Sequence, residues 1–175
     1  MSAVDLVILG FVKKKPLSAY DLAKIIDRTE MARWLKLGLP TVYQNLRKME
    51  GRGYLSAEER EGESAPPKTV YTITAKGEAH WRALMERYSS TPGGIFFDFN
   101  AFVVNVGLLD RPSRLVLLGN LRRHLAEQRD GVARSLERAN ANGQSAGRPL
   151  MEQYERVYGV LVAWIEDYIA EQEGQ

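Results

Sequence analysis

The sequence contains no cysteine and only two histidines among its 175 residues. Without cysteine the chain cannot form disulfides, zinc sites with thiolate ligands or a cysteine nucleophile. Neither His80 nor His124 has a second histidine at metal-ligand spacing, and the residue four positions after His124 is Gln128 rather than an acid. We therefore expect no metal site and no catalytic site at either histidine.

Long apolar runs and catalytic motifs are missing as well. No segment approaches the roughly 18 consecutive apolar residues that a membrane span requires. The opening residues, MSAVDLVILG, carry no basic region before their apolar ones, unlike a signal peptide. The sequence also lacks G-x-S-x-G, H-E-x-x-H and a phosphate-binding glycine loop. These absences predict a cytoplasmic protein that is not an enzyme, needs no cofactor and does not bind a membrane.

The composition is otherwise that of a globular protein, with 45% hydrophobic and 26% charged residues. Its length suits one substantial domain or two small ones. The net charge of +2 is unevenly distributed. Residues 1–52 hold 10 Lys or Arg and 5 Asp or Glu, whereas residues 53–175 hold 14 and 17. A basic first third of the chain favours an anionic partner.

An amphipathic helix is expected within the stretch LGLPTVYQNLRKMEGRGYL, residues 37–55. Its apolar residues follow each other at spacings of three, four and three, which places them on one helix face: Leu39, Val42, Leu46 and Met49. The opposite side has no large apolar group and carries Pro40, Thr41, Gln44, Arg47 and Lys48. By itself this composition fits a solvated helix as well as a binding surface.

The residues before this stretch predict two further helices. A short first helix is expected over Val4–Phe11. Ser18 and Asp21 have the spacing of a capping box, and Leu17 and Leu22 occupy the two positions of a hydrophobic staple. A second helix should therefore begin at Ser18.

A β-hairpin is expected after the third helix. Residues 55–61 and 68–74 read as two strands, because the second, KTVYTI, is rich in β-branched and aromatic residues. Thr74 is suited to cap one more helix. The resulting order of three helices, a hairpin and a helix is that of a winged helix-turn-helix, in which the third helix enters the major groove of DNA.

In that setting the polar side of residues 39–52 gains a role in recognition. Gln44 can pair with an adenine edge, and Arg47 or Lys48 can reach guanine or phosphate. The rival interpretation is a winged-helix module that binds other proteins and no DNA. The basic charge of residues 1–52 argues against this alternative without excluding it.

Several short segments, in order and at suitable distances, resemble PadR-type transcriptional regulators: LSAYDL at 17–22, PTVY at 40–43, GYL at 53–55 and YTITAKG at 71–77. The resemblance covers residues 4–85. It implies a DNA-binding surface that includes Tyr20 and the helix starting near Thr41, with a wing close to the minor groove. The DNA-contacting residues expected on these grounds are Ser18, Tyr20, Pro40, Thr41, Tyr43, Gln44, Arg47, Lys48 and Lys68, with Arg60 a further candidate in the wing.

Two features depart from the family pattern. Gly38 stands where the family often has a serine, so the third helix lacks a side-chain cap, although glycine is tolerated there. The wing is acidic, since four glutamates surround Arg60: Glu58, Glu59, Glu61 and Glu63. Carboxylates repel phosphate, so contact between the wing tip and DNA stays open.

The pair Gly93-Gly94 suggests a boundary between a DNA-binding domain at 1–90 and an α-helical dimerisation domain at 91–175. Residues 95–109 are apolar and aromatic and predict a buried helix, or alternatively a pocket for a small aromatic effector. A long helix should begin at Asp110-Arg111-Pro112, and the run ANANGQSAGRP at 139–149 should end it. The expected fold is thus mainly α with a small β-hairpin.

The last helix has the most regular apolar pattern in the chain. One heptad line and a second line beside it form a band wider than one partner helix requires. The resemblance implies that the terminal helices of two subunits pack together. A homodimer reading a palindromic operator, acting as a repressor, is therefore expected, with an interface formed by Tyr154, Val157, Leu161, Trp164, Ile165 and Tyr168.

Overall fold

The computed structural model describes residues 3–28, 39–60, 67–141 and 147–174. The expected tip of the wing, with Glu61 and Glu63, lies outside these described residues, as does Gly38 before the third helix. The chain divides into two compact units, residues 1–94 and residues 95–175.

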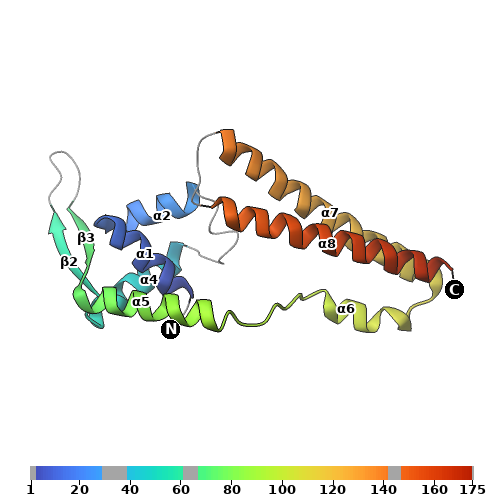
Figure 1. Ribbon diagram of the computed structural model, residues 1–175, viewed down its shortest axis with the longest axis horizontal. Coiled ribbons are helices and arrows are strands. Elements are labelled where there is room, and N and C mark those ends of the chain that lie inside the picture. The colour runs from blue at the N-terminus through green and yellow to red at the C-terminus, as the bar shows by residue number, and fades with distance from the viewer. Residues whose placement is uncertain (1–2, 29–38, 61–66, 142–146, 175) are drawn as a thin grey trace. The chain divides into compact units, whose positions relative to one another are not determined.

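The first unit contains four described helices and a small sheet (Figure 1). In chain order its elements are α1 Ala3–Lys14, β1 Leu17–Ser18, α2 Ala19–Arg28, α4 Leu39–Gly51, β2 Leu55–Arg60, β3 Lys68–Ile73 and α5 Ala75–Ser90. The order expected for a winged helix-turn-helix is confirmed. The helix α4 is the expected third helix, and β2 and β3 form the wing.

Ser18 and Asp21 form the expected cap at the start of α2. The Asp21 backbone N–H donates to Ser18 Oγ at 3.1 Å. The Ser18 hydroxyl in turn donates to the Asp21 carboxylate at 2.7 Å. This pair gives an otherwise unpaired amide of the first turn a partner, so the short local pattern correctly located the helix start.

The sheet has three antiparallel strands in the order β1-β3-β2, one more than the expected hairpin. Tyr71, in the central strand β3, is paired with Leu17 of β1 on one side and with Ala57 of β2 on the other. The additional strand β1 consists of only two residues, Leu17 and Ser18. A segment this short cannot show the alternation from which strands are inferred.

One hydrophobic core holds the first unit together. Val42, Leu46 and Met49 of α4 are buried, as their helical spacing predicts. They pack with fully buried side chains of α1 and α2: Ile8, Leu9 and Leu22. Leu84 and Gly77 of α5 are buried as well. The outer side of α4 therefore stays at the surface.

The second unit is built on two long helices, α7 Arg111–Ala141 and α8 Arg148–Glu173. They lie side by side along their length (Figure 1). Before them come the short helix α6 Asn100–Asn105 and the 3-10 turn η1 Val106–Leu108. The shared core contains Leu118 and Leu125 from α7 and Val162 and Ile165 from α8.

The prediction of one buried helix over residues 95–109 is wrong. Only α6 and η1 are helical in this stretch, and several apolar side chains face solvent: Ile95 (76% exposed), Phe96 (89%), Val104 (83%) and Leu108 (85%). A narrower stripe, Phe99, Phe102, Val106 and Leu109, packs on the core of the second unit. High apolar content suggested burial on all sides, whereas only residues at spacings of three and four reach the core.

Candidate nucleic-acid interface

The outward surface of α4 carries two adjacent stripes of side chains. Gln44 and Lys48 are four residues apart and exposed. Tyr43, Arg47 and Glu50, at spacings of four and three, form the neighbouring stripe and are exposed as well. The structure thus brings the expected DNA-contacting residues of α4 onto one surface, with cations on both stripes. Glu50 adds an acid that the sequence did not single out.

Pro40 and Thr41 occupy the first turn of α4. Pro40 is exposed, and Thr41 is partly buried. The Asn45 side-chain amide donates to the Thr41 carbonyl at 2.8 Å, an interaction within the helix. Asn45 is therefore already engaged, whereas Pro40 remains part of the open surface.

The carboxyl end of α4 is closed by a helix-capping turn. Tyr54 N–H donates to the Met49 carbonyl at 2.9 Å, and Gly53 N–H donates to the Glu50 carbonyl at 2.8 Å. Gly53 has a φ of 72°, a left-handed conformation that glycine adopts without steric cost. This is the hydrogen-bond pattern of a Schellman motif, and it fixes where the chain leaves the helix.

The start of α5 holds this turn from the other side. The Thr74 hydroxyl donates to the Gly53 carbonyl at 2.7 Å and accepts from Gly77 N–H at 3.0 Å. Lys76 Nζ donates to the Arg52 carbonyl at 2.7 Å. A Cβ added at Gly77 would lie 2.0 Å from the Tyr54 carbonyl oxygen, which no real contact permits. The glycine therefore allows α5 to approach the turn after α4 this closely.

Ser18, expected to contact DNA, has a different role in the structure. It is only 4% exposed, and its hydroxyl is engaged with Asp21. Tyr20, two residues further, is 67% exposed in the first turn of α2. The structure places Tyr20, and not Ser18, on the surface that a ligand can reach.

The basic residues of the wing lie beside carboxylates. Lys68 Nζ is 3.6 Å from Asp21, which brings the start of β3 next to the start of α2. The hydrogen bond from Ser18 and then the charge of Lys68 lower the pKa of Asp21. In the same wing Arg60 forms an ion pair with Glu58 at 3.1 Å. These pairings offset the cations of the wing, so α4 carries the stronger attraction for an anion.

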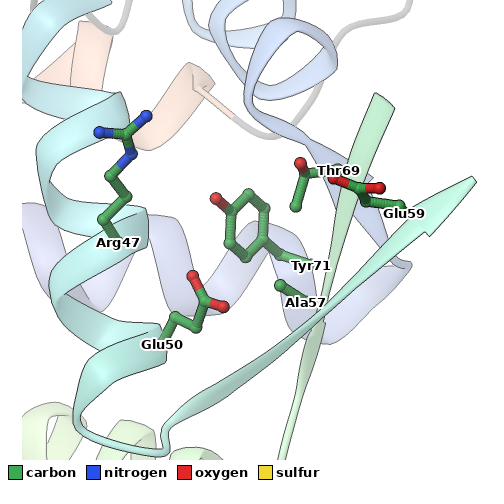
Figure 2. A pocket seen from close by; sticks show the side chains of 6 residues that line it. All are labelled: Arg47, Glu50, Ala57, Glu59, Thr69 and Tyr71. Atoms are coloured by element: carbon green, nitrogen blue, oxygen red, sulfur yellow. The ribbon is translucent and has the colours of Figure 1, made fainter. Parts of the chain in front are cut away.

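A solvent-open hollow of about 550 Å³ lies between α4 and the wing. Figure 2 shows the side chains around it: Arg47 and Glu50 from α4, Ala57 and Glu59 from β2, and Thr69 and Tyr71 from β3. The hollow was not predicted from the sequence. Alternation along β2 and β3 could have grouped these four wing residues on one face. It could not have shown that this face adjoins α4.

The expected dimer residues on α8 divide into two groups. Ile165 is fully buried in the core of its own chain with Leu118, so its side chain is not accessible to a second chain. Trp164 is 37% exposed, and its ring stacks with that of Tyr168 at 6.1 Å between centroids. Tyr154, Val157 and Leu161 are partly buried. The surface available on α8 therefore excludes Ile165.

In the part of the chain that the structure describes, no group of three or more His, Asp or Glu side chains is arranged to hold a metal ion. None of the described helices combines the length and apolarity needed to cross a membrane.

The sequence of the first unit matches a known family profile, that of the transcriptional regulator PadR-like family, over residues 8–83. The match spans the elements from α1 to α5 and so includes α4, the wing and the hollow between them. Among curated proteins, none is similar enough in sequence to count as a relative.

Solved PadR structures share the fold along nearly the whole chain. Bacillus subtilis PadR in complex with operator DNA superposes with a TM-score of 0.82 at 19% identity, covering 98% of this chain and 99% of that chain. The same protein with p-coumaric acid gives 0.79 at 18% identity, with 97% and 95% covered. The PadR-like regulator BC1756 from Bacillus cereus gives 0.68 at 18%, with 97% and 98% covered. At these identities the likeness shows a common fold.

Proposed function

We propose that this protein is a sequence-specific DNA-binding repressor in which α4 enters the major groove. The observation that supports this most directly is the surface of α4. Gln44, Arg47 and Lys48 are exposed together on a helix whose far end is fixed by the turn at Gly53. An amide and two cations are the groups that read base edges and neutralise phosphates.

The comparisons support a role in DNA binding. Residues 8–83 carry the PadR-like domain, and B. subtilis PadR, which shares the fold, has been solved with operator DNA. Tyr20 and Lys68 flank α4 in this proposal, from the start of α2 and the start of β3. Because Lys68 lies beside Asp21 and Arg60 beside Glu58, the wing contributes less attraction to DNA than α4 does.

The proposed repressor acts as a homodimer. One recognition helix covers only a few base pairs, and a twofold dimer presents two of them to half-sites about one helical turn apart. The interface in this proposal is the accessible side of α8: Tyr154, Val157, Leu161, Trp164 and Tyr168. These side chains form one line at spacings of three and four and are partly accessible within the chain, Trp164 most clearly at 37% exposed. A palindromic operator follows from this symmetry.

A small aromatic molecule is the effector that we propose releases the repressor from its operator. The support is the structure of B. subtilis PadR with p-coumaric acid, a protein of the same fold. The second unit carries stacked aromatic side chains, among them Phe99 and Trp164 with ring centroids 6.1 Å apart, which are of the kind that stacks on a flat aromatic ligand. The effector remains a class of molecule rather than a named compound.

Selection of binding sites from a pool of random duplexes tests the DNA-binding function. The wild-type protein should enrich one palindromic sequence, and its affinity for that duplex should fall steeply as salt rises, because bound cations displace counterions. A protein-binding scaffold would enrich no sequence and would bind duplex DNA poorly at both low and high salt. That result would favour the scaffold over the repressor.

A further inference from the structure

Tyr71 is not one of the proposed DNA-contacting residues, yet it lines the same hollow as one of them, Arg47. Its side chain is only 7% exposed, and its ring belongs to the core of the first unit. Figure 2 shows its hydroxyl directed toward α4, with the side chains of Arg47 and Glu50 on either side. A buried ring thus places one polar atom in the hollow next to the recognition helix.

The position of this hydroxyl is fixed by the sheet. Tyr71 lies in the central strand and is paired with Leu17 on one side and Ala57 on the other. A tyrosine side chain has few rotatable bonds, and here the core restricts its ring. Arg47, in contrast, is exposed and has a long flexible side chain. Tyr71 can therefore restrict the Arg47 side chain without a further loss of its own conformational freedom.

The charges around the hollow argue against a phosphate there. Its lining includes two carboxylates, Glu50 and Glu59, and only one cation, Arg47. Burial raises the pKa of Tyr71, and the charge of Glu50 raises it further while that of Arg47 lowers it. The phenol therefore stays neutral near pH 7, able to donate to a carboxylate and to accept from a guanidinium. An anion entering the hollow would meet repulsion from both acids.

Together these relationships suggest different tasks for the two cations of α4. We propose that Tyr71 is a positioning residue that, together with Glu50, orients the Arg47 guanidinium toward a base edge. Lys48, on the neighbouring stripe, is outside this arrangement and binds phosphate as a simple charge. The inference rests on the proposed DNA-binding function and assigns base reading to Arg47 within it. It makes specificity depend on a hydroxyl that itself touches no DNA.

Tyr71→Phe tests this proposal because it removes only the hydroxyl and keeps the buried ring. The probes are the duplex selected by the wild type and a set of duplexes with each base pair replaced in turn. Tyr71→Phe should keep its urea midpoint and salt dependence but lose discrimination at one base pair per half-site, by roughly 5-fold or more. Tyr88→Phe is the matched control, a partly buried tyrosine of α5 that does not line the hollow, and should change nothing.

Arg47→Ala completes a double-mutant cycle. It should lose discrimination at the same base pair, and adding Tyr71→Phe to it should have no further effect, because the hydroxyl acts through the guanidinium. If the losses of discrimination in the two single variants simply add in the double variant, the inference is overturned. Unchanged discrimination in Tyr71→Phe would overturn it as well. A uniform loss of affinity together with a lower urea midpoint would also overturn it and leave Tyr71 a structural residue. A wild-type protein that selects no duplex would instead reject the DNA-binding function, and the inference with it.

Discussion

The imidazole of His80 stacks on the ring of Tyr54, with 4.3 Å between centroids and 12° between the planes. Tyr54 belongs to the capping turn that follows α4, and His80 belongs to α5. The stack therefore joins the end of α4 to the helix that follows the wing. Burial lowers the pKa of His80, with the charge of Arg52 acting in the same direction and that of Asp5 opposing it.

This lowered pKa predicts how stability depends on pH. The unfolded chain binds a proton at His80 near its ordinary pKa of 6.5, whereas the folded chain binds it only at lower pH. The contribution of neutral His80 to the free energy of unfolding is therefore fully present above the ordinary pKa of 6.5, and it is lost as the pH falls through the lower pKa of the folded chain. Urea unfolding between pH 7.5 and about 5 should show this decline. His80→Gln should flatten it, and His124→Gln, a change at an exposed position, should not.

Gly77→Ala should strongly destabilise the first unit. The added Cβ would lie 2.0 Å from the backbone oxygen of Tyr54, which cannot rotate away as a side chain could. We expect a loss of at least about 2 kcal/mol in the free energy of unfolding, measured in urea. Gly51→Ala is the matched control, since nothing lies within 4 Å of its added Cβ. That variant should stay within about 1 kcal/mol of the wild type, in the stabilising direction. Equal losses in both variants would contradict the close approach of α5 to the turn at Tyr54.

Substitutions of Gln44 and Lys48 should impair DNA binding in different ways. Gln44→Ala should cost roughly 1–3 kcal/mol of discrimination at one base pair, because an amide reads a base edge. Lys48→Ala should weaken binding to every duplex alike and reduce the salt slope by about one unit. Titrations of selected and substituted duplexes at several salt concentrations separate these results. If both variants keep full affinity and specificity, α4 does not read DNA.

Leu161→Asp should convert the proposed dimer into monomers, because a charge would be buried at the contact. Sedimentation at micromolar concentration measures this, and operator affinity should be lost with the dimer. Trp164→Ala should act in the same direction through loss of a large aromatic contact. Ala163→Asp, an exposed change on another side of α8, is the control and should leave the dimer intact. A wild-type chain that sediments as a monomer and binds one half-site tightly would refute the dimer.

Local patterns explain which parts of the fold could be predicted from the sequence. The cap at Ser18 and Asp21, the buried face of α4 and the cap at Thr74 depend on residues three or four apart, so their spacing was sufficient. The strand β1 was missed because its pairing with β3 is long-range. The stretch 95–109 was wrongly expected to be buried as one helix, because apolar content does not reveal how many sides have neighbours.

In the candidate site, too, only the residues that lie close together in the sequence could be predicted. Gln44, Arg47 and Lys48 were found from the face of one helix, and they are exposed as expected. Ser18 was assigned to DNA by resemblance, but its hydroxyl serves the cap of α2. Tyr71 and the hollow beside Arg47 could not be found from the sequence. They require α4, β2 and β3 to be brought together, and no local spacing encodes that arrangement.

The central strand of the sheet also determines when the first unit can be completed during synthesis. β3 is the last of the three strands to leave the ribosome, and β1 and β2 both pair with it. Until residues 68–73 emerge, the start of α2 and the strand after α4 have no partner in the sheet. Pairing between Leu17 and Tyr71 closes a loop of most of the unit, a slow step in folding. A ribosome that stalls before Tyr71 would therefore display α4 on a nascent chain whose sheet still lacks its central strand.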